Sequence, residues 1–154
     1  MHGALFFEDL HLGDRWVTQG RTITETDVVN FAGLTGDYDP LHVDHAHARQ
    51  TPFRQPIAHG LLGLSLLAGL GSQCPRVQTV AFVAIRNWEF HKPLFFGDTV
   101  HAVNEILEKQ PSGRRRGKVL WKRQLINQDG AVVQEGIFET LVALSKPGGG
   151  ETEP

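Results

Sequence analysis

One apolar segment in the middle of the chain stands apart from the polar sequence around it. From Gly60 to Gly71 the residues are leucine, glycine, alanine and one serine, and none is charged. The leucines are spread around every face at 3.6 residues per turn, which predicts a helix that is buried on all sides. Glycines 60, 63 and 69 weaken helix formation by roughly 1 kcal/mol each, so we expect a sheet to approach this helix closely. The segment is too short to span a bilayer, which takes roughly 20 residues.

The chain after Pro75 changes to a pattern that is typical of strands. Segments rich in β-branched and aromatic residues, with partial alternation, are predicted as strands over 77–90, 99–108, 118–128 and 131–144. Asp129 and Gly130, between the last two segments, predict a two-residue hairpin turn. An earlier strand is predicted over 15–21. This order of elements predicts one α+β domain in which a curved antiparallel sheet wraps around a central apolar helix.

A second helix is predicted between the first strand and the apolar segment. Thr24 and Asp27 form a short capping box, and the helix is expected to end between Gly33 and Gly36. Residues 45–50 are expected to form one or two helical turns. The domain is predicted to span 1–146, and 147–154 is expected to be a disordered tail because it has little apolar content.

The polar segment after this helix carries the main candidate chemistry. Asp37 and His42 are five positions apart, and Pro40 between them pushes Asp39 toward extended geometry and prevents the segment from continuing as a helix. We therefore expect a bent loop on which the carboxylate and the imidazole face one water molecule. Such a pair is able to take a proton from water and to return one to a substrate.

Gly60 is a second candidate because it lies at the start of the apolar helix. The first N–H groups of a helix have no acceptor within the helix and carry partial positive charge. They can donate to a carbonyl oxygen that gains negative charge, and glycine has no side chain to block the approach. The alternative is that Gly60 only lets the helix pack against the sheet.

Composition limits the partners and the compartment. With 154 residues, 40% of them hydrophobic, the chain has the size and apolar content of one domain. A formal charge of −2 gives no general attraction to nucleic acid or to an anionic membrane. Cys74 is the only cysteine, and the first residues lack the basic and long apolar regions of a signal peptide. We expect a cytoplasmic protein that binds neither nucleic acid nor membrane.

Two linked motifs resemble those of the MaoC-like dehydratases, a family that includes the (R)-specific enoyl-CoA hydratases of the hot dog fold. Residues 35–42 are TGDYDPLH, where the family has Gly-Asp-x-Asn-Pro-Leu-His. Residues 56–60 are PIAHG, and this His-Gly pair opens the central helix in the family. Residues 91–99, HKPLFFGDT, are similar to the family's Pro…Gly-Asp-Thr corner between strands.

By this resemblance Asp37 and His42 are the catalytic residues, and the Gly60 N–H binds the thioester oxygen. The implied reaction is the reversible syn addition of water to a trans-2-enoyl thioester, which gives an (R)-3-hydroxyacyl thioester. Coenzyme A is part of this substrate, and no other cofactor is implied. Further substrate contacts are expected at Tyr38, Asp39, His59, Leu61 and Trp88. Similar proteins pair into dimers that join their sheets, so we expect at least a homodimer.

Two residues depart from the family pattern. Asp39 stands where the family has asparagine, and its second carboxylate near Asp37 can attract a cation. Ala68 stands where some members have a serine that supports the catalytic aspartate. A hydrogen bond that supports Asp37 must then come from another residue or is absent.

Other functions are compatible with parts of this pattern. A hot dog acyl-CoA thioesterase would carry an acid on or beside the central helix, and 60–71 contains none. A metal-dependent or non-catalytic acyl-CoA-binding protein is a further alternative, and its candidate metal ligands are Asp37, Asp39, His42 and Asp44. Their spacing matches no named metal motif and fails the EF-hand pattern. No G-x-S-x-G, G-x-G-x-x-G or G-K-[ST] motif occurs in the sequence.

Overall fold

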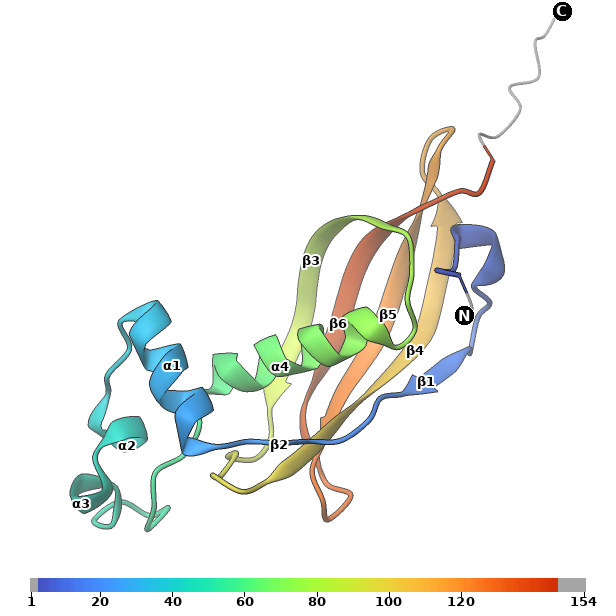
Figure 1. Ribbon diagram of the computed structural model, residues 1–154. Coiled ribbons are helices and arrows are strands. Elements are labelled where there is room, and N and C mark those ends of the chain that lie inside the picture. Colours follow the sequence, from blue (N-terminus) through green and yellow to red (C-terminus); the bar gives the residue numbers. More distant parts are fainter. Residues whose placement is uncertain (1–2, 147–154) are drawn as a thin grey trace, which may run out of the picture.

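The computed structural model describes residues 3–146, in which a sheet curves along one side of a single long helix (Figure 1). The helices are α1 (Glu25–Thr35), α2 (Pro40–Val43), α3 (His45–Ala48) and α4 (Gly60–Gln73), with a 3₁₀ turn, η1, at Phe7–Asp9. The strands are β1 (Arg15–Val17), β2 (Arg21–Thr22), β3 (Thr79–Phe90), β4 (Thr99–Pro111), β5 (Arg116–Ile126) and β6 (Val132–Ala143). The predicted tail, 147–154, lies outside the described residues.

The sheet is antiparallel, and its strand order is β1-β4-β5-β6-β3, with β2 paired to β4 off this path. The four strands predicted after Pro75 are confirmed, as is the α+β arrangement of a curved sheet around one helix. The strand predicted over 15–21 is instead split into β1 and β2. Within residues 3–146, β3 forms an edge of the sheet with no strand on its outer side.

The turn between β5 and β6 is longer than predicted. The last paired residues are Ile126 and Val132, so a two-residue turn at Asp129 and Gly130 is wrong. The Asn127 N–H donates to the Ala131 carbonyl over 3.0 Å, and the Asn127 side-chain oxygen accepts from the backbone N–H groups of 129 and 131. Gly130 takes a φ of +74° in this turn. The hydrogen bonds that the Asn127 side chain accepts within its own loop therefore favour a connection longer than two residues.

Helix α1 begins and ends as its sequence predicts. The Thr24 hydroxyl accepts from the Asp27 N–H over 3.2 Å, and the Asp27 carboxylate accepts from the Thr24 N–H over 2.9 Å. At the other end Gly36 takes a φ of +80°, and its N–H donates to the Ala32 carbonyl. A left-handed residue ends the helix and turns the chain, which favours glycine at this position.

Helix α4 buries only one of its faces in the single chain. Leu62, Gly63, Leu67 and Gly71 are buried against the sheet, whereas Leu61 is 61% exposed. The prediction of burial on all sides is therefore wrong for one chain, because the sheet covers only one side of the helix. No helix within residues 3–146 has the length and apolar character needed to cross a membrane.

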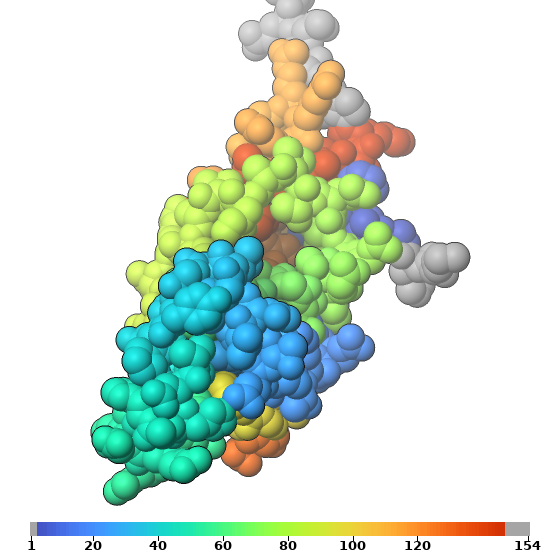
Figure 2. All heavy atoms as spheres, turned by 60° about the vertical axis from the view of Figure 1, so that its left-hand side comes forward, coloured from blue at the N-terminus to red at the C-terminus, as the bar shows by residue number. Residues whose placement is uncertain are grey.

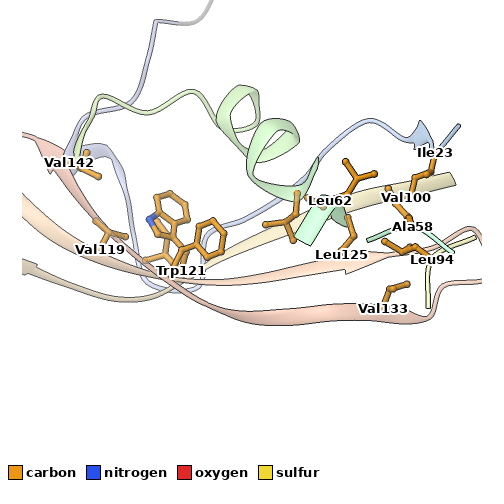
Figure 3. Close-up of a cluster of buried hydrophobic side chains, with 14 of the residues drawn as sticks. Ile23, Ala58, Leu62, Leu94, Val100, Val119, Trp121, Leu125, Val133 and Val142 are labelled. Carbon is orange, nitrogen blue, oxygen red and sulfur yellow. The ribbon is translucent and has the colours of Figure 1, made fainter. Parts of the chain in front are cut away.

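The core lies between this buried face and the inner side of the sheet (Figure 3). Its largest fully buried side chain is Trp121, whose indole N–H donates to the Thr140 hydroxyl over 2.9 Å. Gly63 permits close packing, since a Cβ there would lie 2.3 Å from the Gln134 amide nitrogen. Gly69 has no such role, because no atom of the described residues lies within 4 Å of its Cβ position apart from its two chain neighbours and the nearby backbone of its own helix. The core therefore fixes the position of α4, at whose start the candidate site lies.

Candidate active site

The candidate residues gather at one end of the sheet. Helices α1, α2 and α3 form a lobe beside the start of α4 (Figure 1), and the same segments make one continuous part of the surface in Figure 2. The chain leaves α1 at Gly36, passes through α2 and α3, and returns to begin α4 at Gly60. This path brings the two sequence motifs together in space.

The Asp37 segment is shaped by local hydrogen bonds. Asp39 has extended geometry, as Pro40 predicts, and its carboxylate accepts from the Leu41 N–H over 2.9 Å as the N-cap of α2. His42 therefore lies on a one-turn helix and not on the bent loop that we predicted. The reason is that proline is well tolerated at the first position of a helix, where its missing N–H would have no acceptor. Asp37 precedes this turn, with its side chain 55% exposed.

The His42 ring is fixed by a bond to the backbone. Its Nδ1 lies 2.7 Å from the Ile57 carbonyl oxygen, and a carbonyl only accepts, so Nδ1 carries the proton. In the neutral ring Nε2 is then an acceptor. This arrangement suits His42 to bind a water molecule through Nε2 and to take its proton.

His59 connects the catalytic segment with the start of α4. It is 3% exposed, and its Nε2 donates to the Asp37 carbonyl oxygen over 2.9 Å. Its ring packs on that of His42, with 3.9 Å between centroids, and also on that of Phe31, with 5.0 Å between centroids. Within residues 3–146, its buried Nδ1 has no hydrogen-bond partner. His59 therefore fixes both candidate catalytic residues, Asp37 by the hydrogen bond and His42 by ring packing.

Asp37, His42 and His59 form a tight cluster. One carboxylate oxygen and one nitrogen of each ring lie within 4.8 Å of one another. The structure thus brings the predicted pair close enough to share one water molecule. The same three atoms could ligate a divalent cation, but they are not the ligand set that the spacing suggested. Asp39 caps α2, and Asp44 caps α3 by accepting from the His47 N–H over 3.0 Å, a bond that lowers the pKa of Asp44.

Gly60 follows His59 of this cluster in the chain and is the first residue of α4, so its backbone N–H belongs to the helix N-terminus. No acceptor within residues 3–146 takes that N–H, and the residue lines a hollow of about 260 Å³ together with Phe53 and Phe90. A Cβ on Gly60 would lie 3.0 Å from the Phe90 ring, so only glycine fits without crowding. The hollow gives a ligand carbonyl room to reach the helix N-terminus.

Gln134, which sequence reasoning missed, supports the start of α4. Its side-chain N–H donates to the Gly60 carbonyl over 3.0 Å, and its side-chain oxygen accepts from the Trp88 indole at 3.3 Å. Trp88 packs against Phe138 with 5.6 Å between centroids, and is connected to Gly60 through Gln134. The sequence around it, Val132 to Gly136, also contains Glu135 and gave no signal that Gln134 has this role.

Two of the other predicted contacts are exposed at the surface. Tyr38 is 59% exposed on the segment that carries Asp37. Leu61 follows Gly60 on the uncovered face of α4. Neither side chain belongs to the cluster.

Comparison with known proteins identifies the family of this chain. A family model described as the MaoC like domain matches residues 10–127. The chain belongs to the MaoC-like family. The chain is 38% identical over 113 residues to the 3-hydroxybutyryl-CoA dehydratase of Methylorubrum extorquens, which covers 73% of this chain and 70% of that protein. It is 33% identical over 138 residues to the (R)-specific enoyl-CoA hydratase of Rhodospirillum rubrum, which covers 89% and 91%.

Solved structures place this MaoC-like chain in the hot dog fold. The R-hydratase PhaJ1 of Pseudomonas aeruginosa superimposes with a TM-score of 0.80 at 28% identity, covering 98% of this chain and 95% of that one. A Mycobacterium tuberculosis protein described as a double hotdogfold superimposes with a TM-score of 0.79 at 19% identity, covering 98% and 46%. The predicted family and fold are confirmed.

Proposed function

We propose that this MaoC-like protein is an enoyl-CoA hydratase that also catalyses the reverse dehydration. The observation that carries the proposal is the cluster in which the Asp37 carboxylate and the His42 ring lie within 4.8 Å of each other and of His59, the residue that precedes Gly60 at the start of α4. The names of the relatives, a dehydratase and an (R)-specific hydratase of coenzyme A thioesters, support the same reaction class. The proposed product is the (R)-3-hydroxyacyl thioester, formed by syn addition of water.

In the proposed mechanism Asp37 and His42 hold the water from one side. The water oxygen adds to C3 of the enoyl group, one member of the pair takes a water proton, and C2 receives a proton. The negative charge develops on the thioester oxygen as the C3–O bond forms, the Gly60 N–H stabilises it there, and it is neutralised when C2 takes its proton. Proton transfer by placed side chains accelerates a reaction by about 10²–10⁴-fold, and one oxyanion donor contributes roughly 3–4 kcal/mol. These residues need no cofactor beyond the coenzyme A of the substrate.

We also propose that the protein is a homodimer joined through β3. This edge strand carries apolar side chains with large exposed fractions: Val80 53%, Phe82 56%, Val83 49%, Ile85 38% and Phe90 53%. An unpaired edge with such side chains is suited to pairing with another strand, and a second copy offers the same edge. Sedimentation is expected to show a dimer, which Val83→Lys weakens because it puts a charge into the pairing edge. A stable wild-type monomer would contradict this proposal.

A substrate panel tests the reaction. The purified protein is incubated with trans-2-enoyl-CoA thioesters of several chain lengths while the absorbance of the conjugated thioester is followed. We expect loss of that absorbance with formation of the (R)-3-hydroxyacyl product, unchanged by a metal chelator. Release of free coenzyme A without hydration would instead indicate a thioesterase. Inactivation by the chelator would indicate a metal at the cluster of Asp37, His42 and His59.

A further inference from the structure

A second cavity lies between the later half of α4 and the inner face of the sheet. It has a volume of about 300 Å³, and Ala68 and Gly71 line it from the helix. Phe82 and Phe138 add apolar walls from β3 and β6. Figure 2 shows the hollow between the green residues of α4 and the yellow-green residues of β3. The lining is mostly apolar, which suits the chain of an acyl group.

One charged side chain interrupts this apolar lining. Arg123 extends from β5 on the same face as the buried Trp121 and Leu125, and therefore points toward α4. Its guanidinium carbon lies 4.5 Å from the centre of the Phe138 ring and 5.4 Å from that of Trp121. Cation–π contacts of this kind stabilise the charge but take none of its N–H groups.

Arg123 has no acceptor in the described chain. Within residues 3–146 it forms no ion pair and no hydrogen bond, and its Nε is buried without a partner. The Asn104 side-chain oxygen, on the neighbouring strand, is also buried and unpartnered. Gly71 leaves the space for this arrangement, since a Cβ there would lie 2.9 Å from Nη1 of Arg123 and 3.4 Å from that oxygen.

Buried polar atoms without hydrogen-bond partners lower the stability of the fold unless a ligand supplies the missing bonds. Burial lowers the pKa of Arg123 to about 10, so the guanidinium is still charged at neutral pH. Arg123 as a whole is only partly buried, but a buried N–H group such as its Nε destabilises a protein when it lacks a partner, and a carboxylate can take two parallel N–H bonds from the guanidinium. An acyl chain that ends in a carboxylate would supply both the apolar contact and the missing partner.

We propose that this cavity binds the far end of the acyl group and that Arg123 binds a carboxylate there. The substrate class is then the enoyl thioester of a dicarboxylic acid. The inference rests on the proposed hydratase function and deepens it. Helix α4 links the two sites, because Gly60 at its start and Gly71 near its end are about 16 Å apart at 1.5 Å per residue.

The test compares matched pairs of substrates. Each pair has the same chain length, and one member ends in a carboxylate while the other ends in a methyl group. Wild type is expected to have the higher kcat/KM for the carboxylate member of at least one pair. Arg123→Met is expected to lower kcat/KM for that member by roughly 10- to 100-fold and to leave the methyl member unchanged or improved. Arg123→Lys, which keeps the charge without the planar fork, should be intermediate.

Lys122→Met is the control, because Lys122 is the adjacent cation of β5 and faces the outer side of the sheet beside Glu135. It should leave the preference intact. If Arg123→Met lowers kcat/KM equally for the carboxylate and the methyl substrate, or if wild type prefers the methyl substrate, the inference is overturned while the hydratase proposal stands. Failure of every thioester to react would overturn the hydratase proposal instead.

A binding measurement keeps the two proposals separable. Calorimetry with saturated acyl-CoA analogues, with and without the terminal carboxylate, needs no reaction. The carboxylate analogue should bind roughly 10- to 100-fold more tightly to wild type than to Arg123→Met. Equal affinity for both proteins would contradict the assigned role of Arg123.

Discussion

Replacing Gly63 with alanine is expected to destabilise the fold and to disturb the start of α4. The new methyl carbon would lie 2.3 Å from the amide nitrogen of Gln134 and 2.7 Å from Cδ1 of Leu94. Both neighbours are buried, at 1% and 2% exposure, so neither can move away freely. Gln134 also holds the Gly60 carbonyl, and its displacement would shift the residue that we propose to bind the thioester oxygen.

The size of the effect follows from opposing contributions. Alanine in a helix interior is favoured over glycine by about 1 kcal/mol, which opposes the loss. Overpacking costs about 1–3 kcal/mol, and a buried amide that loses its partners costs about 1–3 kcal/mol more. The free energy of unfolding should therefore fall by about 1–5 kcal/mol. For a chain of this size that is a decrease of about 2–20 °C in Tm.

Urea and thermal denaturation measure this loss. Gly69→Ala is the matched control, because it lies on the same helix and the added methyl group has no atom of another element of the described residues within 4 Å. It should leave the stability unchanged or raise it by up to about 1 kcal/mol. Gly63→Ala combined with Gln134→Ala should cost less than the two single changes added together, since removal of the amide frees space for the methyl group. Equal stability of the two glycine variants, or strict additivity in the double variant, would refute the reasoning.

Two further changes test other parts of the fold. Burial raises the pKa of Asp27, but hydrogen bonds from Thr24 and the Arg21 guanidinium outweigh it and hold that pKa below its ordinary value of 3.8. A lowered pKa stabilises the fold above the unfolded value, so wild type should exceed Asp27→Asn in stability at pH 7, and denaturation at a series of pH values should show the gap closing as the pH falls below 3.8. Trp121→Phe removes the buried bond to the Thr140 hydroxyl and leaves that hydroxyl without a donor, so denaturant titration should show a loss of about 1–3 kcal/mol.

The features that could be predicted from sequence are those with local causes. The capping box of Thr24 and Asp27 needs residues three positions apart, and the left-handed Gly36 ends α1 next to its own last turn. The strands after Pro75 follow from alternation and turn residues. Asp37 and His42 are close because only five positions of chain separate them. That α2 would begin between them, at Pro40, was not predicted.

The features that could not be predicted depend on distant parts of the chain. The tautomer of His42 is set by the Ile57 carbonyl, fifteen positions away, and the glycine start of α4 is held by Gln134, which comes 74 positions later. The unpaired state of Arg123 appears only once the sheet register and the helix position are known. The uncovered face of α4 was missed because apolar residues on all sides predict burial without saying which molecule covers them.

The hydration rate of the best enoyl-CoA substrate, compared among four proteins, tests the central claim most directly. The proteins are wild type, Asp37→Asn, His42→Ala and His47→Ala, the last being a nearby exposed histidine outside the cluster. We predict that the changes at Asp37 and His42 lower kcat by about 10²–10⁴-fold in proteins that stay folded, while His47→Ala keeps its activity. Turnover by the Asp37 and His42 variants at the wild-type rate would contradict the account.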